Sequence, residues 1–223
     1  MPVELDHIFV WASSGGEKEA RALVEFGLSE GTPNTHSGQG TACRRFFFRN
    51  AYLELLWVTE PTEAQSATIR PAHLWERWNA RGTACPFGLC FRPGAHQNCS
   101  VPFPSWEYRP PYLPESWSFH LGTNAGVLNE PLLFYLPFSR RPDSQSGPRK
   151  QVLDHAAGLG ELTRVELIGP HGDSLSPAFE ALLSTGVIRR RDGDRQFVEL
   201  GFDGEPKGRV ADFRPGLPMV ISW

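Results

Sequence analysis

Short apolar runs separated by polar turns predict a protein built mainly from β-strands. The first 60 residues alternate between runs with strand periodicity and one segment with helical periodicity, in which Ala20, Leu23 and Val24 would form the buried stripe. Glycines and Asn50 mark the turns between the later runs. The predicted elements are strands at 5–12, 42–48 and 51–58, a helix at 17–26, a Gly-rich turn at 37–40 and room for another strand at 30–36.

The C-terminal part of the chain repeats this order of elements. It predicts a strand at 161–169, a helix that begins at Ser176 and ends before Gly186, and a hairpin that turns at Asp192-Gly193. When the two parts are aligned, Glu199 falls on Glu54 and Arg164 falls on His7. Three pairs of segments match in the same order: LDHIFV with LTRVEL, VEFGLSEG with ALLSTGVI, and AYLELLW with QFVELGF. Three such matches indicate an internal repeat of a β-α-β-β-β unit.

The middle of the chain is less regular. It predicts a helix at 72–82, strands at 85–93, 116–122 and 131–138, and extended edge strands with ordered loop in the Pro- and aromatic-rich stretch 94–116. Residues 139–150 are polar and lack apolar periodicity, which is typical of a linker. We therefore divide one compact unit into an N-terminal module at 1–62, a middle module at 72–138, a linker-like loop at 139–150 and a C-terminal module at 151–223.

Composition narrows the class of protein. The chain has 223 residues, of which 40% are hydrophobic, so it can bury a core in one large domain or two closely fused ones. A net charge of -3 gives no electrostatic case for binding nucleic acid or an anionic membrane. No apolar run approaches the roughly 18 residues of a membrane span. The N-terminus has no basic region, and the cysteines (Cys43, Cys85, Cys90 and Cys99) lack zinc spacing, so we expect reduced thiols in a cytoplasmic protein.

One carboxylate lies inside an apolar run. Glu54 is central in YLELLWV, and a buried, unpaired carboxylate costs several kcal/mol unless it protonates or meets a cation. The partner would be a metal ion or a cationic side chain. The plainer alternative is a buried His–Glu pair joined by a hydrogen bond, or a Glu–Arg pair with Arg44, Arg45 or Arg164 as the cation. In the alternation of the first strand, His7 shares an apolar face with Leu5, Phe9 and Trp11.

The stretches LDHIFVWA and HSGQGTACRRFFFRNAYLELLWV, with a helix between them, resemble a glyoxalase-like domain of the vicinal oxygen chelate superfamily. The resemblance covers 4–60, continues less closely over 84–138 and includes the C-terminal GRVADFRPGLPMVISW. It implies an α+β fold in which β-α-β-β-β modules form curved mixed sheets around a central cleft with a divalent metal. In that family the ligands are a His or Gln on a module's first strand and a Glu on its last.

Carried onto this chain, the resemblance implies that His7 and Glu54 hold a divalent metal ion such as Zn, Mn, Fe or Ni. The remaining family positions depart from the pattern, because they fall near Leu89 and Tyr135 in the middle module and on Arg164 in the C-terminal one. Completion of the metal shell, or a catalytic base, would then come from Glu199 or His36. The candidates for substrate binding are Arg164, Tyr52 and His120, of which His120 is also a possible third ligand or an ordinary packed histidine.

These observations leave more than one function open. The leading hypothesis is a metal-dependent lyase, isomerase or dioxygenase that acts on a small oxygen-rich molecule. The alternative is a metal-free protein that binds or sequesters a small molecule in the same cleft, with Glu54 held by an arginine and no cofactor. A weaker option is a structural or regulatory domain. Family members often dimerise, so a homodimer is a further expectation, whereas nucleic acid and membrane partners are not expected.

Two local features also stay open. The turn that His36 opens would either present backbone N–H groups to an anion, place His36 at the mouth of the pocket, or be a plain tight turn. The aromatic side chains Trp106, Tyr108, Tyr112 and Trp117 would line a binding groove or cover the edge of a sheet.

Overall fold

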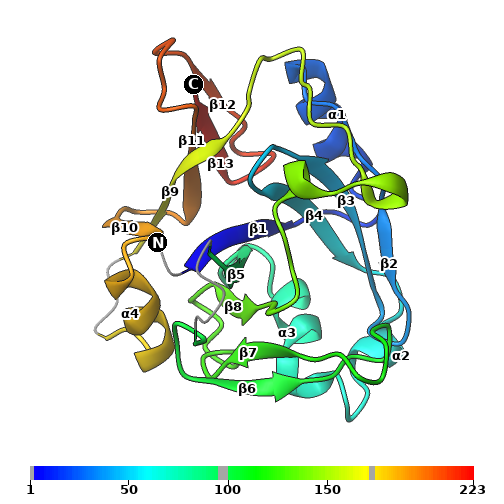
Figure 1. Cartoon of the computed structure of the whole chain (residues 1–223). Helices are drawn as coiled ribbons and strands as arrows, with labels where there is room; N and C mark the ends of the chain where they lie inside the picture. The colour runs from blue at the N-terminus through cyan, green and yellow to red at the C-terminus, as the bar shows by residue number, and fades with distance from the viewer. Residues whose placement is uncertain (1–2, 95–99, 171–173) are drawn as a thin grey trace.

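The structure, a computed structural model, describes residues 3–94, 100–170 and 174–223. Within these ranges the fold is mixed α+β, with two sheets and few helices (Figure 1). In the described part of the chain, no helix is both long and apolar enough to cross a bilayer. The helices are α1 (Glu17–Phe26), α2 (Pro61–Ala64), α3 (Leu74–Asn79) and α4 (Pro177–Ser184), with 3-10 turns η1 (Arg70–Ala72), η2 (Pro142–Ser144) and η3 (Gly147–Arg149).

The larger sheet has eight strands in the order β2-β3-β4-β1-β5-β8-β7-β6 and curls into a half-barrel (Figure 1). Its strands are β1 (Val3–Trp11), β2 (Asn34–His36), β3 (Thr41–Phe47), β4 (Tyr52–Val58), β5 (Phe87–Pro93), β6 (Ser105–Tyr108), β7 (Phe119–Gly122) and β8 (Leu132–Tyr135). β1 is parallel to β4, β5 is parallel to β8, and the two halves join where β1 and β5 pair antiparallel. Each half therefore has the same strand order about this junction.

The two faces of the half-barrel bury different side chains. Ile8, Val10 and Leu55 pack with most of the buried apolar residues into a large core on the outer face. Phe9 and Leu56 belong to a second, smaller cluster on the concave face. Because successive side chains of a strand point to opposite faces of the sheet, one set packs into the large core and the other set lines the concave face, where a site can form.

Several local predictions need correction. The helix expected at 72–82 is only α3, because His73 adopts a left-handed conformation (φ 53°) that separates it from η1. The capping-box spacing of Ser14 and Glu17 predicts a side-chain cap for α1, and this prediction is wrong. The N-cap residue is Gly16, and the nearby Ser13 donates its backbone N–H and its hydroxyl to Glu19. Ser176 does cap α4, accepting a hydrogen bond from the Phe179 N–H at 3.2 Å.

The C-terminal sheet contains β9 (Leu162–Gly169), β10 (Arg189–Asp192), β11 (Phe197–Phe202), β12 (Val210–Asp212) and β13 (Met219–Ser222), in the order β10-β9-β11-β13-β12. Here β9 pairs antiparallel with β11, whereas β1 pairs parallel with β4. The predicted equivalence of Glu199 with Glu54 and of Arg164 with His7 is therefore wrong. The sequence pattern repeats, but the strand pairing does not.

The hairpin between β3 and β4 connects the two sheets. The Asn50 side chain accepts from the Leu162 N–H at 2.9 Å and donates to the Leu162 carbonyl at 2.8 Å, like the backbone of a neighbouring strand. The segment predicted as a linker also contacts this hairpin, since the Asp143 N–H donates to the Arg49 carbonyl. The C-terminal sheet is thereby fixed against the outer face of the half-barrel.

Candidate functional site

A cavity of about 150 Å³ lies on the concave face of the eight-stranded sheet. Its charged and strongly polar lining residues come from the first half of the sheet: His7, His36, Gln39, Arg45 and Glu54. Many of its apolar lining residues come from the second half: Phe119, Leu121, Leu132, Phe134 and Leu136. An engineered apolar cavity of similar volume accommodates benzene, so the space suits a small molecule.

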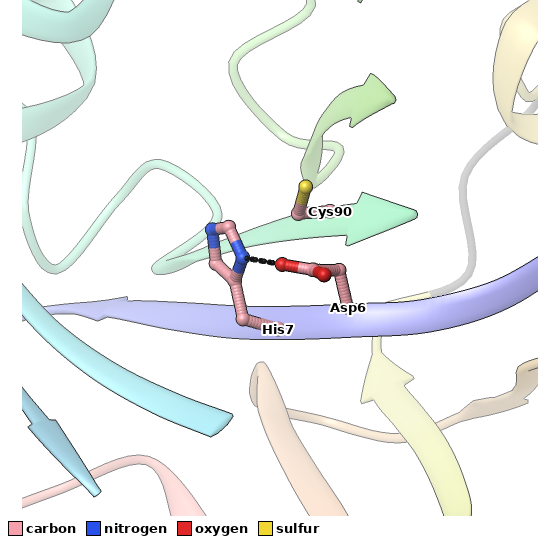
Figure 2. Close-up of side chains that lie close together, drawn as sticks. All are labelled: Asp6, His7 and Cys90. Atoms are coloured by element: carbon pink, nitrogen blue, oxygen red, sulfur yellow. Dashed lines mark hydrogen bonds and ion pairs between the residues drawn. The ribbon is translucent and has the colours of Figure 1, made fainter. Parts of the chain in front are cut away.

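His7 is held in a fixed orientation by Asp6 (Figure 2). Its Nδ1 donates to Asp6 Oδ1 at 2.8 Å, and the ring stacks on Tyr52 with centroids 4.3 Å apart. Burial would raise the pKa of Asp6, but the hydrogen bond from His7 and the charge of Arg92 hold that pKa below its ordinary value. Because an ionised carboxylate only accepts hydrogen bonds, a neutral His7 ring has its hydrogen on Nδ1 and its lone pair on Nε2, the nitrogen that faces Glu54.

A bulge makes this contact possible. Strict alternation would direct Asp6 and His7 to opposite faces, but the register of β1 against β5 shifts between Leu5 and His7. Leu5 consequently packs against the outer core, and the predicted sharing of one face by Leu5 and His7 is wrong. The bulge thus allows the consecutive side chains of Asp6 and His7 to form their hydrogen bond.

Glu54 reaches the same cavity from β4. Its Oε2 lies 3.8 Å from His7 Nε2, and both side chains are more than nine-tenths buried. Among the described residues, no arginine or lysine forms a salt bridge with Glu54: Arg44 binds Glu30, and Arg45 donates to the Thr32 and Pro33 carbonyls. The predicted convergence of His7 and Glu54 in one hollow is confirmed, and the alternative of an arginine partner is wrong.

Two further residues approach Glu54 from β2 and β3. A ring nitrogen of His36, the Cys43 sulfur and a Glu54 oxygen all lie within 4.8 Å of one another. Burial raises the pKa of the Cys43 thiol, and the charge of Glu54 and a hydrogen bond to it raise it further, so Cys43 is a protonated donor. Burial also lowers the pKa of His36.

The turn that precedes β3 places His36 in the cavity. Gly38 and Gly40 both have positive φ, and a Cβ on Gly40 would lie 2.3 Å from the Glu60 carbonyl oxygen. The Gly38 N–H donates to the Glu63 carboxylate at 2.8 Å. This backbone N–H, which the sequence suggested as a donor to a bound anion, therefore already has a partner within the chain. Of the alternatives left open by the sequence, His36 at the pocket is the one observed.

The other predicted site residues divide into two groups. Tyr52 lines the cavity. Glu199 and Arg164 instead form an ion pair at 3.2 Å on the C-terminal sheet. His120 contacts Ser105 on β6, whereas the neighbours of His120 on β7, Phe119 and Leu121, line the cavity. These three residues are not part of the site.

Among the described residues, the second half of the sheet brings no matching ligand pair into the cavity. Leu89 and Tyr135, which stand near the family's ligand positions, belong to the outer core. The residues of β8 that line the cavity are Leu132 and Phe134. Gly88 on β5 leaves room for the Phe9 ring, whose nearest carbon is 2.0 Å from where a Cβ would be.

Buried His, Cys, Asp and Glu side chains at the cavity could hold a metal ion. Two ligands about 2.0–2.1 Å from a tetrahedral ion lie about 3.3 Å apart, close to the 3.8 Å between His7 and Glu54. The Asp6–His7 contact is the usual support of a metal-binding histidine. The cluster of Asp6, His7 and Cys90 (Figure 2) fits a metal less well, because Asp6 already accepts hydrogen bonds from His7, Arg92 and Ser139.

Sequence reasoning missed Asp6, Gln39 and Arg92. Arg92 is almost completely buried and bonds Asp6, Glu4 and the Asn50 carbonyl. The sequence feature that could have identified Arg92 is a charged residue within the apolar run CFRP. The feature that could have identified Asp6 is its position next to His7. Among the aromatic candidates, Tyr108 and Tyr112 line the cavity. The described cysteines, Cys43, Cys85 and Cys90, are buried and are not in disulfides, and Cys99 lies outside the described residues.

Comparison with known proteins shows the fold and no more. No family model matches the chain, and no curated protein matches it. A solved structure described as a hypothetical protein from Staphylococcus aureus is similar over 100% of this chain and 99% of that chain, with a TM-score of 0.50 and 11% sequence identity. The curled mixed sheet is compatible with a vicinal oxygen chelate fold.

Proposed function

We propose that the protein is a divalent-metal-dependent enzyme of the glyoxalase-like, vicinal oxygen chelate type, with its metal held by His7 and Glu54. The observation that carries the proposal is the buried carboxylate of Glu54, which faces the free Nε2 of His7 at 3.8 Å and has no arginine or lysine salt-bridge partner among the described residues. A cation between the two groups would offset the cost of burying that charge.

The side chains around the pair would each have a distinct part in the reaction. Asp6 keeps the hydrogen of His7 on Nδ1, and Arg92 keeps Asp6 ionised. Cys43 donates to Glu54 and remains a thiol. When bound, the metal would lower the pKa of a coordinated water or polarise an oxygen of the substrate. His36, which also lines the cavity, would form a hydrogen bond with that substrate.

The shape of the cavity suggests the substrate. The polar lining residues come from the first half of the sheet and the rings of Phe119 and Phe134 from the second, and the volume is about 150 Å³. Arg45 is the only lysine or arginine among the described lining residues. We infer a small molecule with oxygen ligands at one end and an apolar body that packs on β7 and β8, such as a substituted diol or dicarbonyl compound. The reaction would be a lyase, isomerase or dioxygenase step.

A metal-free binding protein is the second candidate. The observation in its favour is that Leu132 and Phe134 occupy the concave face of β8, where a second ligand would come from. In that case the aromatic wall would hold an apolar ligand, and Glu54 would accept hydrogen bonds from Cys43 and other donors.

Metal analysis separates the two candidates. The enzyme should copurify with, or take up, about one equivalent of Zn, Mn, Fe or Ni, and both His7→Ala and Glu54→Gln should abolish uptake. The matched control is Glu107→Gln, which changes an exposed carboxylate paired with Arg109 and should leave uptake unchanged. A protein that binds none of the four metals after soaking, yet is stabilised by an apolar ligand in the presence of EDTA, supports the second candidate.

A further inference from the structure

The two histidines in the cavity belong to different hydrogen-bond networks. His7 Nδ1 contacts the Asp6 carboxylate, which can only accept, so the hydrogen of a neutral His7 ring is on Nδ1. His36 Nδ1 instead lies 2.9 Å from the hydroxyl oxygen of Thr41. A hydroxyl can donate or accept, so the hydrogen position in His36 depends on where Thr41 directs its own hydrogen.

The neighbours of Thr41 determine that direction. Gln39 Nε2 donates to Thr41 Oγ1 at 2.9 Å, and the Tyr108 hydroxyl donates to Gln39 Oε1 at 3.2 Å. The opposite amide orientation would leave the Tyr108 hydroxyl hydrogen without an acceptor among the described residues. Thr41 is completely buried, and in the described ranges its hydroxyl has polar contacts only with Gln39 and His36. Its single hydrogen therefore goes to His36 Nδ1, since the opposite arrangement leaves a buried hydroxyl hydrogen without an acceptor.

We propose that Thr41, Gln39 and Tyr108 are positioning residues that hold His36 as an N–H donor toward the cavity, in the tautomer opposite to that of His7. The hydrogen of the neutral His36 ring is then on Nε2. His36 consequently donates to Glu54 or to an oxygen of the bound molecule and does not ligate the metal. The bound molecule presents a carbonyl, enolate or hydroxyl oxygen at this point, where a fixed donor stabilises developing negative charge.

The same network closes the half-barrel. β2 and β6 are the opposite edges of the eight-stranded sheet, and within the described part of the chain no strand pairing joins them (Figure 1). Gln39, in the turn after β2, meets Tyr108 at the end of β6, and the His36 ring contacts Tyr112 with centroids 4.8 Å apart. The side-chain contacts that set the tautomer of His36 thus also bring the two edges together over the cavity.

Histidine ¹⁵N NMR of the metal-free, full-length protein tests the proposal. In a neutral imidazole the protonated and unprotonated nitrogens have well-separated shifts, and the His36 signals are assigned by their loss in His36→Gln. We expect His36 to be protonated on Nε2 and His7 on Nδ1. Thr41→Val, which keeps the shape without the hydroxyl, should shift His36 toward Nδ1 protonation. Thr41→Ser should restore the wild-type pattern, and Thr35→Val on the exposed face of β2 should not alter it.

Two results overturn the proposal: wild-type His36 protonated on Nδ1, or a His36 tautomer that Thr41→Val leaves unchanged. If Thr41→Val does not fold, the wild-type and Thr41→Ser spectra still decide. The proposal for His36 rests on the proposed function only for the identity of the bound molecule. Titration with Zn²⁺ distinguishes failure of the His36 proposal from failure of the proposed metal site. Zinc should perturb His7 Nε2 and leave the His36 Nε2 hydrogen in place. Loss of that hydrogen refutes the proposal while supporting a metal site, whereas no response to zinc refutes the metal site alone.

Discussion

Replacement of Asp6 by Asn tests whether this carboxylate both stabilises the fold and orients His7. Asp6 and Arg92 are each 2% exposed in their side chains and lie 3.3 Å apart. At an effective dielectric constant of about 20 their gross attraction is about 5 kcal/mol. Loss of one partner of a buried pair costs about 3–5 kcal/mol. Asn keeps an oxygen for His7, and Glu4 still pairs with Arg92 at 2.9 Å, so we expect the lower end, about 3 kcal/mol.

Chemical denaturation measures this loss in the metal-free protein. About 3 kcal/mol corresponds to a melting temperature lower by roughly 6–12 °C for a domain of this size. The matched control is Asp143→Asn, whose pair with Arg141 is about one-third exposed and should contribute no more than about 1 kcal/mol. An Asp6→Asn protein that unfolds like the control would show that the buried pair does not stabilise this fold.

The same variant has a second, independent readout. Substitution of a residue that supports a metal-binding histidine lowers metal affinity by roughly 10–100-fold. We expect a decrease of that size in zinc titrations of Asp6→Asn under conditions where the variant is folded. Unchanged affinity together with lower stability would refute the argument that Asp6 orients His7 for the metal.

The other predictions concern the ligand, pH and the cavity wall. Zinc at 100 times its Kd should stabilise the wild type by about 2.7 kcal/mol and raise its melting temperature by roughly 5–11 °C; Glu54→Gln should remove this shift, and a retained shift would exclude Glu54 as a ligand. His155 uses both ring nitrogens, accepting from the Ser29 N–H at 2.9 Å and donating to a backbone carbonyl of β3, and burial lowers its pKa. Its contribution to stability is complete above the ordinary pKa of about 6.5 and is lost as pH falls toward the lowered folded value, so the free energy of unfolding should decrease below about pH 6.5, and less so in His155→Gln. Parallel pH curves for the two proteins would contradict this assignment. Gly88→Ala places a Cβ 2.0 Å from the Phe9 ring and should cost about 1–3 kcal/mol in urea unfolding, whereas a neutral result would mean that the ring moves freely into the cavity.

Local sequence patterns predicted much of the secondary structure because they report short-range physics. The alternation in LDHIFVWA and YLELLWV requires two buried faces, and the glycines before β3 require positive φ. The prediction over 72–82 was wrong because a left-handed His73 is set by its surroundings and has no local signal. The predicted internal repeat does not extend to the pairing of strands: β1 and β4 are parallel, whereas β9 and β11 are antiparallel. The order of elements along the chain does not determine which of the two arrangements forms.

The sequence by itself determined that His7 and Glu54 are polar groups on apolar strands, and therefore that something must offset a buried charge. Only the tertiary structure decided that these two groups face each other, that the arginines are committed elsewhere, and that Glu199 and Arg164 lie on another sheet. It also brought Thr41, Gln39 and Tyr108 to His36, the last from the opposite edge of the sheet. The physical reason is that burial is encoded residue by residue, whereas the partners of a buried polar group depend on how distant strands pair and curl.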